Sequence, residues 1–202
     1  IAIIGRHALI IGVDGGTLYL LSANIIPHVV IGDMDSLPDE DRQILNSNSV
    51  QTITFPTQKD ETDFELALGY AVSQGCDQAW VFGGLHGRLD HMLANILLPL
   101  PFRDQLTVQF IFGNAEIFFV HHKTSIQGTP GDIVSLIPMN NIVTGVRTRG
   151  LRYPLNDEPL FPGKSRGVSN ILEHPRAEVS IQSGDLLCIH LAKNNPGDQT
   201  RR

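Results

Sequence analysis

Short apolar runs alternate with amphipathic stretches along the first half of the chain. Runs of about four to six apolar residues are typical of buried strands, and longer stretches with apolar residues three or four apart are typical of helices. The apolar runs predict strands at residues 8–13, 28–31, 50–55 and 78–82. The amphipathic stretches predict helices at residues 17–23, 38–46, 62–74 and 91–100. Strands alternating with helices predict a mostly parallel sheet with helices on both faces.

The pattern changes after about residue 104. From there, short strand-like runs follow one another with polar turns between them, at residues 108–112, 116–121, 133–137, 142–148, 177–181 and 186–191. This spacing predicts an antiparallel sandwich or barrel. We therefore predict two domains, an α/β domain over residues 1–104 and an all-β sandwich over residues 105–202.

Composition excludes several classes of protein. The 202 residues carry a formal net charge of −6, and Arg and Lys are scattered rather than massed. This disfavours nucleic acid or an anionic membrane as the main partner. No apolar run approaches the roughly 20 residues of a membrane span. The two cysteines, Cys76 and Cys188, lie far apart, which favours a reducing cytoplasm over a disulfide framework.

Acidic clusters stand where apolar runs give way to glycine or to polar turns. They are Asp14-Gly15-Gly16, Gly32-Asp33-Met34-Asp35-Ser36, Lys59-Asp60-Glu61-Thr62-Asp63 and Gly87-Arg88-Leu89-Asp90-His91. The strand ends of an α/β sheet form its ligand-binding edge. Carboxylates gathered there repel one another unless a cation joins them, and Mg²⁺ held by carboxylates and substrate phosphates is the usual solution. The pattern indicates an enzyme that acts on a phosphorylated nucleotide.

Asp33 and Asp35 are separated by one residue. On an extended segment both side chains face the same way, so both carboxylates can address one metal ion. The alternative is an Asx turn in which Ser36 caps the helix predicted to begin near Pro38.

Asp60 and Asp63 bracket a predicted helix start, with Thr62 or Asp60 as the capping residue. The helix dipole favours acids in a first turn without any functional need, so capping is the alternative to ligand binding here. Lys59 is an unusual residue for a helix start and is better explained by a contact with phosphate.

The loop from Gly83 to Arg88 follows a predicted strand and precedes a predicted helix. Glycines allow backbone N–H groups to approach a phosphate chain, and the following helix N-terminus adds positive potential. Arg88 has the geometry to clamp phosphate oxygens. Asp90 is a candidate metal ligand, base or N-cap, whereas His91 is more typical of a cap or packing residue than of a catalyst.

In their order along the chain, these motifs resemble those of the thiamin pyrophosphokinase (thiamin diphosphokinase) family. Asn95, which follows the Gly-Gly-x-x-Gly-Arg-x-Asp-His loop, extends the match. In the second half, Thr148 to Leu155 and Gly167 to Asn170 resemble the family's Gly-Leu-x-(aromatic)-Pro-Leu and Ser-Asn elements. The resemblance spans roughly residues 8–191 and rests on several motifs in a shared order.

The resemblance implies an N-terminal α/β domain that binds ATP, a C-terminal sandwich that helps to bind thiamin, and a homodimer with active sites between subunits. By position, Asp33, Asp35 and Asp63 would hold Mg²⁺ and the triphosphate. Asp90 would lie near the reacting hydroxyl, and Arg88 would steady the leaving AMP or the transferred group.

The rest of the implied site is divided between the two substrates. Ser169 and Asn170 would face the thiamin pyrimidine. The ATP site would also include Asp14, Gly15, Gly16, Lys59, Asp60, Thr62, Gly84, Gly87 and Asn95.

The chain departs from the family pattern in two places. Only Ile1 to His7 precede the strand that ends at Asp14, where the family usually has a complete first strand, a Gly-rich turn and a helix. Because the first residue is not Met, we expect the true beginning to lie upstream. No aromatic residue follows Asn170 to stack on thiamin, so stacking would have to come from elsewhere, such as Tyr153 or Phe161.

The expected reaction transfers a pyrophosphoryl group from ATP to the thiamin hydroxyl and releases AMP. A pterin diphosphokinase would use the same ATP site with another alcohol. A phosphohydrolase with an Asp-x-Asp nucleophile is disfavoured because no Thr or Val follows Asp35 and a Gly-Arg-x-Asp loop is present. A non-catalytic nucleotide-sensing module would require a silent active site, yet every acid that the reaction needs is present.

Overall fold

The computed structural model describes residues 8–33, 37–55 and 60–193 of the chain. These residues fall into two compact units, which divide between Asp77 and Gln78. Asp35, Lys59 and the ends of the chain lie outside the described residues.

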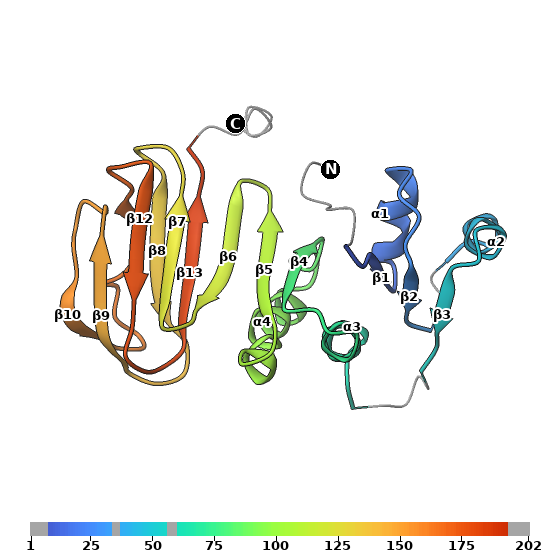
Figure 1. The fold of residues 1–202 in the computed structure, drawn as a ribbon, viewed down its shortest axis with the longest axis horizontal. Coiled ribbons are helices and arrows are strands. Elements are labelled where there is room, and N and C mark those ends of the chain that lie inside the picture. The colour runs from blue at the N-terminus through green and yellow to red at the C-terminus, as the bar shows by residue number, and fades with distance from the viewer. Residues whose placement is uncertain (1–7, 34–36, 56–59, 194–202) are drawn as a thin grey trace. The chain divides into compact units, whose positions relative to one another are not determined.

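The first unit is a three-stranded parallel sheet with helices on both faces (Figure 1). The strands lie in the order β1-β2-β3. Along the chain the elements are β1 (Ile11–Val13), α1 (Gly16–Ser22), β2 (Val29–Ile31), α2 (Asp39–Ser47), β3 (Gln51–Ile53) and α3 (Asp63–Ser73).

The central strand β2 explains why helices cover both faces of this sheet. Successive side chains of a strand point to opposite faces, and all three residues of β2 are apolar and buried. Val29 and Ile31 share a cluster with Ala67 of α3. Val30 shares another with Leu45 of α2, against which the α1 leucines pack. An uninterrupted apolar strand is the expected sequence for a strand buried on both faces.

The second unit contains two sheets that pack as a sandwich (Figure 1). One sheet has the order β10-β9-β12-β7, and the other has the order β11-β8-β13-β6-β5-β4. All pairings in these sheets are antiparallel except that between β4 and β5, which is parallel.

The elements of the second unit begin with β4 (Gln78–Phe82), α4 (Leu89–Leu97), the 3₁₀ turn η1 (Leu100–Phe102), β5 (Thr107–Phe112) and β6 (Ala115–Val120). They continue with β7 (Lys123–Gln127), β8 (Ile133–Pro138), β9 (Val143–Arg149), β10 (Asn156–Leu160), β11 (Asn170–Ile171), β12 (Arg176–Ser180) and β13 (Leu186–Leu191).

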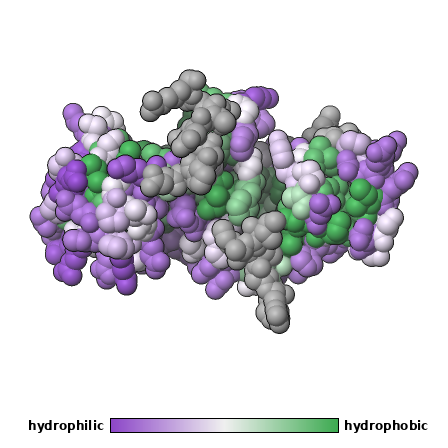
Figure 2. Space-filling view, turned by 90° about the horizontal axis from the view of Figure 1, so that it is seen from above, coloured by the Kyte–Doolittle hydropathy of each residue, from purple (hydrophilic) through white to green (hydrophobic). Residues whose placement is uncertain are grey.

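Alternating residues of the facing strands fill the sandwich core. Leu136 of β8 and Leu186 of β13 enter the core from the larger sheet, and Val146 of β9 and Val179 of β12 enter it from the smaller one. On β9, exposed arginines at 147 and 149 alternate with these inward residues. Accordingly, the β9–β10 end presents a mainly hydrophilic surface in Figure 2.

The structure confirms the predicted fold class, an α/β part followed by a β-sandwich. Three strands were not predicted: β7, β10 and the two-residue β11. β7 and β10 are the edge strands of the smaller sheet. In β7 only Ile126 is buried, and β10 contains Pro159, which an edge strand tolerates because one side of its backbone needs no partner.

The two compact units divide between Asp77 and Gln78, whereas the predicted domain boundary lies after residue 104. β4 and α4 belong to the second unit because β4 pairs with β5 along its whole length, from Gln78↔Thr107 to Phe82↔Ile111. The prediction of an α/β domain over residues 1–104 and a sandwich over residues 105–202 stays a prediction.

None of the helices in the described ranges is both long and apolar enough to cross a membrane.

Candidate functional site

The first two predicted acids follow neighbouring strands of the parallel sheet. Asp14 follows β1 and Asp33 follows β2 after Gly32, and these strands pair with Val13 opposite Ile31. The Asp14 N–H donates to the Ile31 carbonyl over 2.9 Å. A Cβ on Gly32 would lie 3.2 Å from the Asp14 Cα. The two strand ends therefore meet at one edge of the sheet, as the sequence predicts.

The backbone at Asp14 adopts a conformation that L-residues rarely take. Its φ of +43° lies in the left-handed region, which costs a non-glycine residue on the order of 1 kcal/mol and is often found at functional sites. Gly15 and Gly16 follow, and apart from adjacent residues and the backbone of α1 itself, no described atom lies within 4 Å of the position that a Cβ would occupy at either residue. This turn leaves space for a ligand beside its backbone.

Helix α3 begins at Asp63, another of the predicted acids. Thr62 is its N-cap, and the Thr62 hydroxyl accepts a hydrogen bond from the Glu65 N–H at 3.2 Å. Asp63 and Glu65 occupy the first turn, and Asp60 is exposed in the preceding loop. Of the two candidate caps, Thr62 fills the role.

The cap assigns Thr62 a structural role that mutation can separate from ligand binding. Thr62→Ala should lower the free energy of unfolding by about 1 kcal/mol, because the Glu65 N–H loses its partner. Thr62→Ser should retain most of the stability, and urea unfolding monitored by circular dichroism measures both variants. Unchanged stability combined with weaker ATP binding would instead assign Thr62 to the ligand.

The glycine loop of the second unit is held in place by α4. Gly83 and Gly87 have φ values of +80° and +81°, a conformation that favours glycine. The side-chain amide of Asn95 donates to the Gly84 carbonyl over 2.7 Å. Asn95, a predicted ATP-site residue, therefore braces the backbone of the loop.

Arg88 and Asp90 form a bidentate ion pair on the surface. Arg88 Nε lies 3.2 Å from Asp90 Oδ1, and Arg88 Nη2 lies 2.6 Å from Oδ2. The hydrogen bonds from Arg88 hold the pKa of Asp90 at about 2. α4 begins at Leu89, earlier than predicted, so Asp90 lies in its first turn and Arg88 is the N-cap. A paired Asp90 is a very weak base.

The residues predicted to face thiamin differ sharply in exposure. Ser169 is exposed and has a left-handed φ of +59°. Asn170 is buried, and its side chain is hydrogen-bonded to the backbone of Tyr153. Ser135 of β8 accepts a hydrogen bond from the Ser169 N–H at 3.1 Å. Ser135 was not among the predicted site residues, although a serine between Val134 and Leu136 in an apolar run is a detectable signal.

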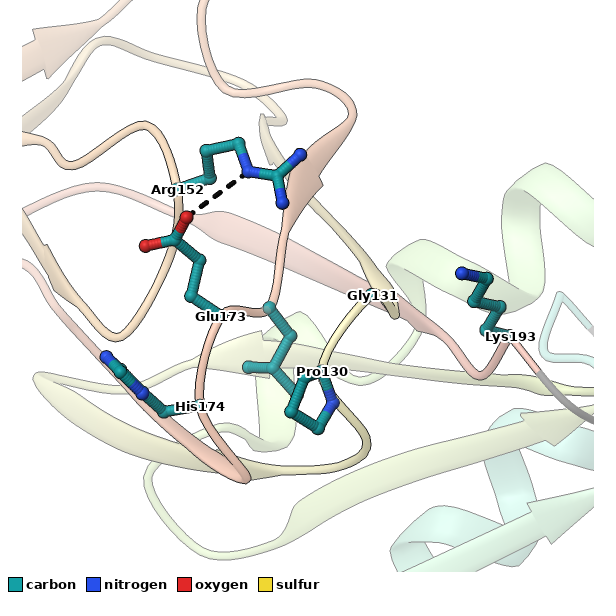
Figure 3. Close-up of a pocket in the computed structure, with 7 residues that line it drawn as sticks. Pro130, Gly131, Arg152, Glu173, His174 and Lys193 are labelled. Carbon is teal, nitrogen blue, oxygen red and sulfur yellow. Dashed lines mark hydrogen bonds and ion pairs between the residues drawn. The ribbon is translucent and has the colours of Figure 1, made fainter.

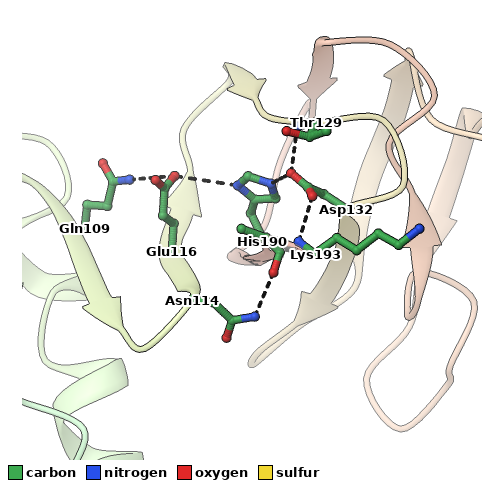
Figure 4. Close-up of polar contacts among 8 residues, drawn as sticks. Gln109, Asn114, Glu116, Thr129, Asp132, His190 and Lys193 are labelled. Atoms are coloured by element: carbon green, nitrogen blue, oxygen red, sulfur yellow. Dashed lines mark hydrogen bonds and ion pairs between the residues drawn. The ribbon is translucent and has the colours of Figure 1, made fainter. Parts of the chain in front are cut away.

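The sandwich also contains a buried ion pair that no motif in the sequence indicates. His190 Nε2 lies 3.0 Å from Asp132 Oδ2, and both side chains are almost fully buried. Asp132 also accepts hydrogen bonds from the N–H groups of Thr129 and Lys193 (Figure 4). On the other side of the ring, Glu116 Oε2 lies 3.7 Å from Nδ1. The pair joins β13 to the residue that directly precedes β8. Neither of its members is one of the predicted site residues.

The second unit carries an open cavity of about 450 Å³. Arg152 and Lys193 contribute positive charge to it, and Arg152 Nε donates to Glu173 over 3.2 Å (Figure 3). Its walls are Pro130, Gly131, Arg152, Leu172, Glu173, His174 and Lys193. None of the predicted site residues lines this cavity.

The structure thus describes the predicted site in two parts. The first unit contains Asp14, Gly15, Gly16, Asp33, Asp60, Thr62 and Asp63, and the second contains Gly84, Gly87, Arg88, Asp90, Asn95, Ser169 and Asn170. Within residues 8–33, 37–55 and 60–193, no three or more His, Cys, Asp or Glu side chains are gathered closely enough to hold a metal ion. Asp35 and Lys59 lie outside these residues.

Two family models match the chain in sequence order. A model described as "Thiamin pyrophosphokinase, catalytic domain" matches residues 2–110. A model described as "Thiamin pyrophosphokinase, vitamin B1 binding domain" matches residues 121–186.

Individual relatives match over almost the whole chain. Thiamine pyrophosphokinase from Bacillus subtilis is 33% identical over 195 residues, which cover 91% of this chain and 87% of the relative. The crystal structure of the B. subtilis thiamine pyrophosphokinase superposes with a TM-score of 0.86 at 30% identity, over 96% of this chain and 92% of that one. The structure of thiamin pyrophosphokinase from Geobacillus thermodenitrificans superposes with a TM-score of 0.82 at 28% identity, over 95% and 90% of the respective chains.

Proposed function

The chain belongs to the thiamin pyrophosphokinase family, and we propose on this basis that it transfers a diphosphoryl group from ATP to the hydroxyl of thiamin. The observation that carries the proposal is the presence of both family domains, catalytic and vitamin B1-binding, in order on one chain. The match to the vitamin B1-binding model favours thiamin over a pterin as the acceptor alcohol.

In the proposed reaction the thiamin hydroxyl oxygen attacks the β-phosphorus of ATP. The bond from the β-phosphorus to the α–β bridging oxygen breaks, AMP leaves with that oxygen, and the hydroxyl proton is lost. Little covalent chemistry falls to the protein, so positioning and electrostatics supply most of the acceleration.

We assign the acids of the first unit to the metal and the triphosphate. Asp33, Asp35 and Asp63 would hold Mg²⁺, and Asp14 would lie beside the nucleotide. The carboxylates of Asp14 and Asp33 follow adjacent parallel strands, and carboxylate oxygens are ligands that suit Mg²⁺. When bound, the metal would neutralise charge that develops on the phosphate oxygens.

The Arg88–Asp90 pair supports a role for both residues in the reaction. A phosphate that binds Arg88 competes with Asp90 for the guanidinium. Released from that pair, Asp90 loses the main cause of its low pKa of about 2 and becomes a better acceptor for the hydroxyl proton. Substrate binding at Arg88 would therefore prepare Asp90 as the base.

We also propose that the enzyme is a cytoplasmic homodimer. Both cysteines, Cys76 and Cys188, are free thiols, as expected in a reducing compartment. Leu89, Leu93 and Leu97 form an exposed apolar stripe with a four-residue spacing on α4, and such a stripe suits an interface. Sedimentation equilibrium would test the dimer, and a monomer at assay concentration would contradict it.

The function is tested by AMP release from ATP and Mg²⁺, measured with thiamin, with a hydroxymethylpterin, and with neither. The proposal requires AMP that depends on thiamin, together with thiamin diphosphate identified by mass spectrometry. AMP release that depends only on the pterin would mean that the acceptor alcohol is a pterin and not thiamin. Failure of both alcohols, with ATP still bound, would indicate a nucleotide sensor.

Ser169 offers a separate test of the thiamin end of the site. Ser169→Ala should raise KM for thiamin several-fold through the loss of one hydrogen bond and should leave KM for ATP unchanged. Ser165→Ala is a matched control, because Ser165 is an exposed serine in the same loop. An effect confined to ATP would refute this placement of thiamin.

A further inference from the structure

The Asn170 side chain uses its hydrogen-bonding groups within the protein. The Oδ1 atom accepts from the Tyr153 N–H at 3.0 Å and from its own neighbour, the Ile171 N–H, at 2.9 Å. The Nδ2 atom donates to the Tyr153 carbonyl over 2.7 Å. Asn170 is only 5% exposed. A side chain so enclosed and so engaged has little capacity left for a substrate.

One side chain thus binds both backbone polar groups of Tyr153. Pro154 follows and further restricts Tyr153 to extended backbone conformations. On either side, Leu151 and Leu155 are buried in the sandwich core. The backbone of Tyr153 is therefore held from both sides and through its own peptide groups.

Neighbouring contacts anchor the same segment. The Arg152 N–H donates to the Ile171 carbonyl over 2.9 Å. The Leu155 N–H donates to the buried Thr148 hydroxyl over 2.9 Å. Each contact fixes main chain, and none of them fixes the Tyr153 ring, which is 54% exposed.

The residue on the other side of Asn170 is also displayed outward. Ser169 has a left-handed φ of +59° and an exposed side chain, and Ser135 holds its N–H. Strained, well-supported positions of this kind are typical of binding sites. The buried amide of Asn170 therefore lies between the exposed hydroxyl of Ser169 and the backbone of Tyr153, which carries an exposed aromatic ring.

We propose that the Tyr153 ring stacks on the aromatic part of the acceptor substrate, and that Asn170 is a positioning residue that acts through Tyr153. The proposal rests on the proposed function for the identity of that substrate as thiamin. A flat cationic heteroaromatic ligand suits a tyrosine face, because stacking and cation–π attraction act together. Asn170 then contributes by limiting the directions in which the ring can point.

The experiment measures KM for thiamin, KM for ATP and kcat, together with the Kd of thiamin by calorimetry. Tyr153→Leu should raise the KM and Kd of thiamin on the order of 10-fold through lost stacking, with KM for ATP unchanged. Tyr153→Phe, which keeps the ring, should remain close to wild type. Phe161→Leu tests the rival candidate for stacking, since Phe161 is an exposed aromatic residue of the same unit, and its effect should be smaller than that of Tyr153→Leu.

Asn170→Ala should raise KM for thiamin in the wild-type background and have little further effect when Tyr153 is already Leu. If the fold-changes in KM for thiamin of the two single variants multiply in the double variant, Asn170 contacts the substrate directly. That result would overturn its positioning role. Asn170→Asp, which keeps the acceptor but repels the Tyr153 carbonyl, provides the same comparison if the alanine variant does not fold. Asn114→Ala removes one similar bond, to the Ala192 carbonyl, and should change neither KM.

The outcomes separate this inference from the proposed function. Thiamin-dependent AMP release by the wild type, with unchanged thiamin affinity in Tyr153→Leu, would overturn the stacking role and leave the function intact. A larger effect of Phe161→Leu than of Tyr153→Leu would also overturn it. A wild type that releases no AMP would defeat the proposed function, and the calorimetric comparison would still test the ring.

Discussion

Replacement of Asp33 by Asn should lower kcat about 100- to 1,000-fold while the protein remains folded. The substitution keeps the size of the side chain and removes the negative charge that the proposed Mg²⁺ site requires. Asp33 follows β2, directly after Gly32 at the edge where β1 and β2 pair. AMP release at saturating thiamin and ATP over a range of Mg²⁺ concentrations measures the loss.

Asp39→Asn is the matched control for this prediction. Asp39 is an exposed acid in the first turn of α2, so its replacement changes the net charge equally and should leave turnover close to that of the wild type. A near-normal kcat in Asp33→Asn, with an unchanged circular dichroism spectrum, would remove Asp33 from the metal site.

Replacement of Asp132 by Ala should destabilise the protein by about 3–5 kcal/mol, because one partner of a buried ion pair is lost. The N–H groups of Thr129 and Lys193 would lose their acceptor, and His190 would lose the carboxylate 3.0 Å away. Thermal unfolding should show a midpoint lower on the order of 10 °C. Asp104→Ala, at an exposed acid of the same unit, should shift it little.

The pH dependence of this loss follows from two opposed pKa shifts. The nearby Glu116 carboxylate chiefly raises the pKa of His190, against the effect of burial, and Asp132 raises it further. Burial acts to raise the pKa of Asp132, but hydrogen bonds from Lys193, Thr129 and His190 together lower it.

A raised pKa stabilises the fold fully below the unfolded value, near 6.5 for His190, and this contribution fades as the pH rises through the folded value. A lowered pKa stabilises the fold above the unfolded value, near 3.8 for Asp132, and that contribution fades as the pH falls through the folded value.

The difference in the free energy of unfolding between wild type and Asp132→Ala should therefore be greatest between about pH 4 and pH 6.5. Urea unfolding at about pH 5.5 and about pH 9 would reveal it. Equal differences at both values would show that charge adds nothing to the pair.

Periodicity in the sequence predicts the elements that bury a face. β13 has the predicted bounds, and β2 reads as apolar throughout because helices cover both of its sides. β7 and β10 bury too little to be recognised, since an edge strand needs few apolar residues and tolerates Pro159. A local apolar pattern therefore misses edge strands that are as polar as β7 and β10.

The candidate site divides in a similar way between what the sequence predicts and what it does not. Strand ends placed Asp14 and Asp33 beside each other, because parallel strands bring their carboxyl ends to one edge. Side-chain direction is not predictable from a motif, and Asn170 turns inward to the Tyr153 backbone. Asp132 and His190 are 58 residues apart, and only the pairing of β8 with β13 brings them together.

The pairing of β5 on both of its sides has a practical consequence for dissecting the enzyme. The segment that matches the catalytic-domain model ends at residue 110, inside β5, whose Phe110 is buried and pairs with Ile117 of β6. A fragment ending there would lack β6 and would leave β5 with an unpaired, apolar edge, which favours aggregation. Any exchange of the vitamin-binding half between relatives would have to carry β4 and β5 with it, so the cut belongs between Asp77 and Gln78.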